Sequence, residues 1–283
     1  MTAAERVTGR VTYHGEGAVW FDGWGGLRLV DLLAGAVLSL DETTGAISRI
    51  DVGSPVAACV RPRVGGGFVV ATERELALWG PDGREWTSPP LWEAPVRFNE
   101  GSCDPAGRFL CGSMAYDGAP GAGTMWRLNR DRSVEPLFGD VTISNGLGFT
   151  ADGSRAYYTD TTTRRIDVFD LSDGELTGRR PFVTVAEGPG NPDGLTVDAD
   201  GGVWTALYGG GAVHHYDAAG RLTDVIEVDA TQVTSCTLGG PDLTTLYITT
   251  SRENLGPDDQ PAAGSIFRAD AAVPGLPVLT CAL

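Results

Sequence analysis

The sequence predicts an all-β fold, a six-bladed β-propeller with four-stranded antiparallel blades, formed by residues 1–283 as a single domain. Three observations lead to this prediction. Turn motifs recur at a regular interval, the segments between them are short and rich in β-branched and aromatic residues, and no long amphipathic helical pattern is present. A chain of 283 residues is long enough for one large β domain with a sizeable core.

Two interleaved series of Asp- and Gly-rich turns run along the chain. The first begins at positions 22, 65, 104, 152, 200 and 242, and the second at positions 41, 82, 131, 173 and 217. Successive members of one series are 39–49 residues apart, so each repeat contains two hairpin turns and the chain holds about six repeats. A repeat that continues along the whole chain favours a propeller over a β-sandwich or a jelly roll.

The segments between the turns are typical of short strands. Examples are GGFVVAT (66–72), RAYYTD (155–160), GGVWTAL (201–207) and TTLYITT (244–250). No run of 10–12 residues free of Gly and Pro carries apolar residues at helical spacing. We expect the N-terminal stretch EGAVWF (16–21) to complete the blade that the C-terminal strands begin, because this closes the ring and limits exposed edges.

The charge and the cysteine pattern restrict the partners and the compartment. The formal net charge is −16, which disfavours binding to nucleic acid and to anionic membrane surfaces. No secretory signal and no apolar run of about 18–20 residues is visible, so we expect a cytoplasmic protein that does not bind membranes. The five cysteines are odd in number and widely spaced, which is typical of reduced thiols.

Four polar residues lie at nearly the same phase of the repeat, just before the strand expected to be innermost. Asn99, Asn145 and Asp193 lie eight residues before the turn glycine of their repeats, and Glu16 lies seven before Gly23. Rotation about a propeller axis would bring such residues together at one mouth of the channel. Two carboxylates and an amide oxygen converging there, without lysines at the same phase, indicate a hard divalent cation. The alternative is that the Asn-Gly and Asp-Gly pairs only cap turns.

Five stretches carry a family likeness, in order from the first repeat to the last. They are GEGAVWFD (15–22), RFNEGSCDPAGRFLCGSM (97–114), SNGLGFTADGSRAYYTD (144–160), NPDGLTVDADGGVWTALYGGG (191–211) and TSCTLGG (234–240). Through them the chain resembles the regucalcin (senescence marker protein)/gluconolactonase family of sugar lactonases. These are six-bladed propellers that bind one divalent metal at the tunnel mouth. The resemblance implies a metal-dependent hydrolase that opens sugar (aldono-) lactones to aldonic acids, with a small-molecule sugar lactone as its partner.

Carried over by position, the resemblance makes Glu16, Asn145 and Asp193 the ligands of one divalent metal ion. Three oxygen ligands leave coordination positions for water and substrate, because a hard cation takes six to eight. The ion, which on this ligand set could be Ca, Mg, Mn or Zn, would polarise the lactone carbonyl. Asp193 is the candidate catalytic base, and a metal-bound hydroxide is the alternative nucleophile.

The resemblance also implies a substrate-binding set. Arg97 and Asn99 match residues that contact the substrate. Asp117 stands where family members such as regucalcin carry a Glu, and its side chain is one methylene shorter, so the resemblance does not determine its contact. Residues 113–126 and 251–264 are expected to form loops that border the mouth, where loop variation sets specificity.

Two other functions remain open on sequence grounds. A related site could hydrolyse organophosphates or aryl esters, and a propeller with the same three ligands could bind calcium without catalysis. Arg97 and Asn99 favour an enzyme, because a simple calcium buffer needs no substrate contacts. The sequence does not determine the oligomeric state or the particular lactone.

Overall fold

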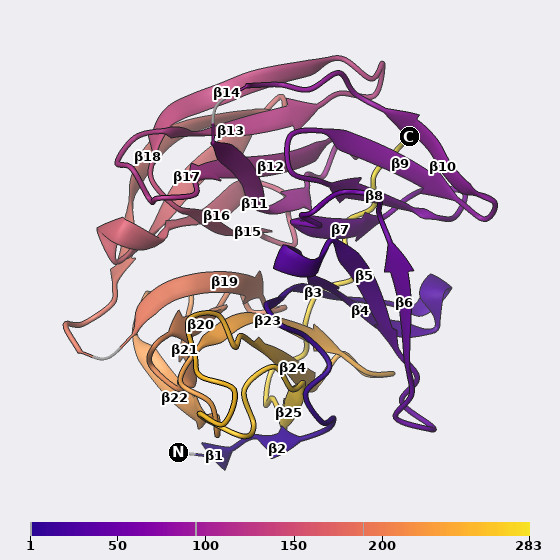
Figure 1. The fold of residues 1–283 in the computed structure, drawn as a ribbon. Coiled ribbons are helices and arrows are strands. Elements are labelled where there is room, and N and C mark those ends of the chain that lie inside the picture. The colour runs from indigo at the N-terminus through magenta and orange to yellow at the C-terminus, as the bar shows by residue number, and fades with distance from the viewer. Residues whose placement is uncertain (1, 94, 189) are drawn as a thin grey trace.

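The computed structural model describes residues 2–93, 95–188 and 190–283, and places six β-sheets radially around a central axis (Figure 1). Each sheet is built on an antiparallel meander of consecutive strands. The first strands of successive sheets contact one another in the closed order β3, β7, β11, β15, β19, β23 and back to β3. This arrangement confirms the six-bladed β-propeller, with the first strand of each blade innermost.

The first three blades occupy the N-terminal half of the chain. Blade one contains β3 (Gly15–Phe21), β4 (Gly26–Asp31), β5 (Ala36–Leu40) and β6 (Ile47–Asp51). Blade two contains β7 (Cys59–Pro62), β8 (Phe68–Ala71), β9 (Leu76–Gly80) and β10 (Gly83–Thr87). Blade three contains β11 (Val96–Cys103), β12 (Phe109–Ala115), β13 (Gly123–Leu128) and β14 (Val134–Val141). Short 3-10 turns, η1 (Asp22–Trp24) and η2 (Leu32–Ala34), connect the first strands.

The remaining blades follow the same plan. Blade four contains β15 (Ser144–Phe149), β16 (Arg155–Asp160), β17 (Arg165–Ser172) and β18 (Glu175–Thr184), with η3 (Thr161–Thr163) between the second and third strands. Blade five contains β19 (Asn191–Val197), β20 (Val203–Tyr208), β21 (Ala212–Tyr216) and β22 (Leu222–Glu227). Blade six contains β23 (Val233–Gly239), β24 (Thr245–Thr250) and β25 (Phe267–Asp270). The first turn series lies between strands one and two of each blade and the second between strands three and four, as the repeat predicts.

The ring is closed by a segment other than the expected one. The fourth strand of blade six is β2 (Glu5–Arg6), which pairs antiparallel with β25. The expectation that residues 16–21 complete this blade is wrong, because they belong to β3 and begin blade one. The short turn at η1 joins β3 to β4, so β3 must pair with β4 in blade one. The chain upstream of β3 is therefore the N-terminal segment that can pair with the outer edge of β25. The neighbouring β1 (Thr2–Ala3) pairs parallel with β22 of blade five.

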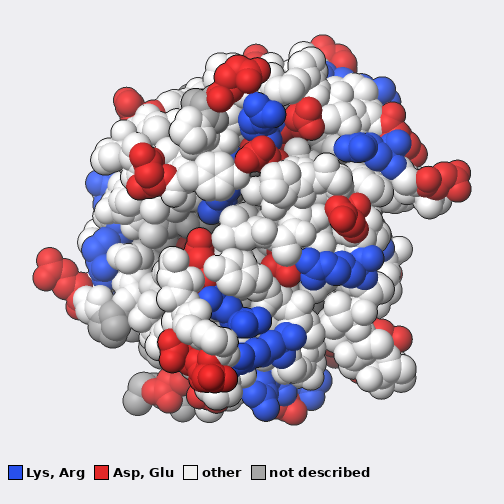
Figure 2. Space-filling view, viewed as in Figure 1, with Lys and Arg blue, Asp and Glu red and all other residues white. Residues whose placement is uncertain are grey.

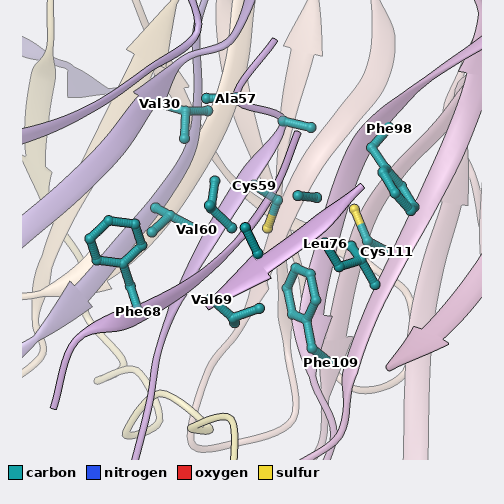
Figure 3. Close-up of a cluster of buried hydrophobic side chains, with 14 of the residues drawn as sticks. Val30, Ala57, Cys59, Val60, Phe68, Val69, Leu76, Phe98, Phe109 and Cys111 are labelled. Carbon is teal, nitrogen blue, oxygen red and sulfur yellow. The ribbon is translucent and has the colours of Figure 1, made fainter. Parts of the chain in front are cut away.

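The hydrophobic core lies between neighbouring blades. Its largest described cluster joins blades one to three and includes Val30, Cys59, Phe68, Phe98 and Phe109 (Figure 3). The thiols of Cys59 and Cys111 point into this cluster among aliphatic and aromatic side chains (Figure 3). All five cysteines are buried and free, in agreement with the expectation of reduced thiols.

Glycines allow the innermost strands of successive blades to approach closely. Gly146 and Gly194 lie inside β15 and β19, so the Asn-Gly and Asp-Gly pairs to which they belong do not cap turns. A Cβ on Gly146 would lie 2.6 Å from the backbone N of Leu195, and one on Gly194 would lie 2.8 Å from Oγ of Ser235. A side chain at either position would therefore push two blades apart.

The outer surface mixes charges of both signs. Acidic and arginine side chains are interspersed over the face in Figure 2, with no broad basic area there. No helix among the described residues is long and apolar enough to cross a membrane.

We predict that Gly146→Ala lowers the free energy of unfolding by about 1–3 kcal/mol, because the added methyl collides with the backbone of β19. Denaturant unfolding followed by tryptophan fluorescence measures the change. Gly139→Ala is the matched control, since a Cβ at Gly139 meets nothing within 4 Å and its stability should stay close to wild type. Equal stabilities of the two variants would show that the inner strands can separate without cost.

Candidate functional site

The candidate site residues lie where the innermost strands are irregular. In five of these strands two residues face a single residue of the neighbouring strand: Gly17-Ala18 in β3, Asn99-Glu100 in β11, Asn145-Gly146 in β15, Asp193-Gly194 in β19 and Thr234-Ser235 in β23. In β3 the register shifts directly after Glu16. Such bulges redirect side chains and are common beside active sites. Here they turn five equivalent strand segments toward the axis at one end of the ring.

A chain of hydrogen bonds joins the amide side chains across blades three, four and five. Asn99 Nδ2 donates to Asn145 Oδ1 at 3.0 Å and to the carbonyl of Ser144 at 2.7 Å. Asn145 Nδ2 donates to Thr161 Oγ1 at 2.7 Å, and Thr161 Oγ1 donates to the carbonyl of Pro192 at 2.9 Å. These bonds define the orientation of the Asn145 amide and leave one lone pair of Oδ1 for a further partner.

Glu16 and Asp193 form a buried pair of like charges. Burial raises the pKa of the Glu16 carboxyl well above its usual range, and the charge of Glu100 raises it further. Burial also raises the pKa of Asp193 well above its usual range, with Glu16 as the next contributor. Glu16 Oε2 accepts a hydrogen bond from the Gly17 N–H, whereas the buried Asp193 Oδ1 has no hydrogen-bond partner among the residues that the structure describes. An unpaired buried carboxylate oxygen is costly, so this site suits a proton or a cation.

Two arginines of the innermost strands are also buried. Arg97 Nη1 donates to the Phe98 carbonyl and to Asn99 Oδ1, and its charge lowers the pKa of both Glu16 and Asp193. Burial itself lowers the pKa of the Arg97 guanidinium. Arg61, from β7, donates to backbone carbonyls of Val60 and Gly17 deeper in the channel.

Glu100 is a third buried acid that the sequence reasoning missed. Burial raises the pKa of its carboxyl to about 7, while the charge of Arg61 lowers it. No hydrogen-bond partner of its Oε2 atom is found in the described part of the chain. Glu100 directly follows Asn99 in the bulge of β11. Its position in the repeat, next to a predicted site residue, could therefore have identified it from the sequence. Arg61 had no such signal, because β7 pairs with β8 without a register shift.

The donor set fits a hard cation only when the amide is included. Within residues 2–93, 95–188 and 190–283, no three His, Cys, Asp or Glu side chains are grouped as a metal site. Glu16 and Asp193 provide two carboxylates, and Asn145, held by Asn99 and Thr161, provides a neutral oxygen in Oδ1. The unpartnered Asp193 Oδ1 is the observation that favours a cation at this point.

Asp117 does not join this group. It is exposed, and its Oδ1 accepts a hydrogen bond from the Ala119 N–H, which caps the turn after β12. The neighbouring Tyr116 lies closer to the site: the Arg97 guanidinium carbon is 5.9 Å from its ring centroid. Tyr116 OH donates to Glu73 Oε1 at 2.7 Å, so the loop within residues 113–126 borders the mouth through its tyrosine.

The C-terminal segment covers the opposite end of the channel. A cavity of about 310 Å³ lies between the innermost strands and residues 276–279, lined among others by Val19, Arg61, Leu147 and Leu195. The segment is held there by the bridges Asp198↔Gly275 and Arg63↔Cys281. The acids and amides therefore lie at the other end, among the loops that carry Tyr116 and Glu253.

Comparison with known proteins agrees with this geometry. The family model described as SMP-30/Gluconolactonase/LRE-like region matches residues 14–252. The chain is 38% identical over 272 residues to the pentonolactonase XacC of Haloferax volcanii, covering 93% of this chain and 92% of that protein. It is 32% identical over 278 residues to regucalcin of Oryctolagus cuniculus, covering 93% of each. A solved calcium-binding protein, regucalcin of Agrobacterium tumefaciens, is 25% identical with a TM-score of 0.91, covering 100% of this chain and 98% of that chain. The chain therefore belongs to the SMP-30/gluconolactonase/LRE-like family.

Proposed function

We propose that the protein is a divalent-metal-dependent lactonase that hydrolyses sugar lactones to aldonic acids. The observation that carries the proposal is the buried Glu16–Asp193 pair, with an unpartnered carboxylate oxygen, beside Asn145 at the open end of the channel. Membership of a family described by gluconolactonase and the similarity to a pentonolactonase support the choice of substrate class.

In this proposal Glu16, Asn145 and Asp193 hold the cation. Carboxylate and amide oxygens are ligands that Ca²⁺, Mg²⁺ and Mn²⁺ prefer and that Zn²⁺ accepts. The bound cation would polarise the lactone carbonyl and stabilise negative charge on its oxygen. Calcium has support from the similarity to a calcium-binding regucalcin.

Asp193 is the proposed general base. Its Oδ1 has no hydrogen-bond partner in the described residues, so it can accept the proton of an attacking water. The water oxygen then forms the new bond to the lactone carbonyl carbon, and the bond to the ring oxygen breaks. The ring oxygen takes up a proton and becomes the hydroxyl of the aldonic acid. The overall change is the addition of one water molecule across the ester bond.

Arg97 and Asn99 are the proposed substrate contacts. The Arg97 guanidinium uses one nitrogen for the Phe98 carbonyl and Asn99, and its other N–H groups are directed at oxygens of the substrate in this proposal. Asn99 Nδ2 holds Asn145, so Asn99 couples substrate contact to the orientation of a ligand. Asp117 has a weaker case, because its side chain caps a turn.

The charge pair makes a prediction about stability. A folded-state pKa above the unfolded one means that the native state holds its protons more tightly, so the metal-free protein should lose stability as pH rises above the ordinary carboxyl range. At neutral pH Glu16→Gln should raise the free energy of unfolding of the metal-free protein by about 1–2 kcal/mol, because it removes a buried charge. Thermal unfolding of the metal-free proteins across a range of pH measures the loss of stability and the effect of Glu16→Gln, and is repeated with calcium.

In the same experiment calcium should raise the Tm of wild type and leave that of Glu16→Gln nearly unchanged. Glu42→Gln, a change of the same type at an exposed residue of blade one, is the control and should respond to calcium as wild type does. An equal calcium response in all three proteins would place the cation elsewhere.

A substrate panel tests the activity. Chelated protein should hydrolyse pentonolactone and gluconolactone only after a divalent metal is added back, with kcat/KM well above that for phosphotriesters and aryl esters. Asp193→Asn should lower kcat by about 100-fold or more, since it removes the base and a ligand. Asp152→Asn, at an exposed turn of blade four, should retain full activity. Full activity of Asp193→Asn would contradict the proposed role of Asp193. Metal binding without turnover of any ester would contradict the proposal that the protein is an enzyme.

A further inference from the structure

One acidic side chain at the open end of the channel has no part in the proposed chemistry. Glu253 lies in the loop that follows β24, and its side chain is 30% exposed. Its Oε2 accepts a hydrogen bond from Tyr208 OH at 3.4 Å and lies 3.5 Å from His14 Nδ1. His14 precedes Glu16 by two residues, and Tyr208 pairs with Asn191, two residues before Asp193. The carboxylate of Glu253 therefore contacts residues near the ends of both strands that carry the buried acids Glu16 and Asp193.

The backbone of Glu253 is held firmly in this position. Its carbonyl accepts a hydrogen bond from Gln232 Nε2 at 2.8 Å, and its N–H donates to Ser251 Oγ at 2.9 Å. Arg252 N–H donates to the Tyr13 carbonyl at 2.7 Å. The loop is thus attached to blade six and to the strand entry of blade one, so the position of the carboxylate is preorganised.

Few side-chain donors within the described residues contact this carboxylate. The nearest nitrogen of His14, Nδ1, approaches Glu253 Oε2 only to 3.5 Å. The His14 Nδ1 atom also lies 2.7 Å from Ser251 Oγ. No arginine in the described ranges donates to the Glu253 side chain, although its charge acts on the nearby Arg97. Its accepting capacity is therefore met only in part, by Tyr208.

We propose that Glu253, with Tyr208 beside it, is a specificity-determining residue that binds hydroxyl groups of the sugar lactone. The inference rests on the proposed function, which places the lactone carbonyl at Glu16, Asn145 and Asp193. A partly exposed carboxylate on the solvent side of these groups faces the part of the substrate that projects from the reacting carbonyl. Carboxylates accept short, strong hydrogen bonds from hydroxyls, so a polyhydroxylated lactone is favoured over a bare one.

The experiment compares two lactones of the same ring size. A γ-lactone of a pentonic acid carries hydroxyls, and γ-butyrolactone carries none. Glu253→Ala should reduce the ratio of their kcat/KM values by about 10- to 100-fold, through loss of the hydroxylated substrate alone. Glu253→Gln and Tyr208→Phe should move the ratio in the same direction by smaller factors. Binding of an unreactive pentonic lactam, measured by calorimetry, should weaken in parallel.

Asp258→Asn is the matched control, because Asp258 is an exposed acid of the same loop. It should leave both lactones unaffected. If Glu253→Ala changes neither lactone, or reduces both equally, the side chain does not bind substrate hydroxyls and the inference is wrong. Failure of the proposed function gives a different result, because wild type itself would then hydrolyse neither lactone, and the inference would fall with it.

Discussion

Repulsion between two buried carboxylates is the constraint on which the channel mouth depends. Glu16 and Asp193 are almost completely removed from water, burial raises the pKa of both carboxyls, and the charge of Glu16 raises the pKa of Asp193 further. Glu100 adds to this negative charge, whereas Arg97 and Arg61 offset it only in part. The folded chain thus holds an excess of acid where solvent cannot screen it. Such an arrangement is stable only with bound protons or with a cation, and this is why the surrounding groups are best understood as a binding site.

The scaffold enforces this repulsion through close packing of the inner strands. Gly146 and Gly194 let β15 approach β19 and let β19 approach β23, so the residues just before them cannot move apart without opening the ring. Closure by β2 on β25 completes the circle, so the first and last blades cannot separate without breaking this pairing. The energy of the interfaces between blades therefore compensates for the unfavourable charge at the axis, as is common where function and stability conflict.

Local signals allowed much of this to be predicted from the sequence. Turn residues act within a few positions, so the two turn series gave the correct number of blades, and the phase of Asn145 and Asp193 placed them at the inner strands. Ring closure was not predictable in this way, because it depends on which N-terminal segment reaches the free edge of β25. The direction of Asp117 within its loop and the bridging position of Glu253 likewise depend on tertiary contacts that no sequence pattern encodes.

Chemistry and selectivity are located on different parts of the fold. The residues proposed to bind the cation lie on bulged strands packed on both sides, whereas Tyr116 and Glu253 lie in loops attached to the rim. Strand positions are fixed by neighbouring blades, but loops can vary without disturbing the ring. The negative charge of the rim has a second consequence for a lactonase, because its substrate is neutral and its product is a carboxylate. An acidic mouth repels the product more than the substrate, so the same charge that destabilises the metal-free fold would favour release of the product after each turnover.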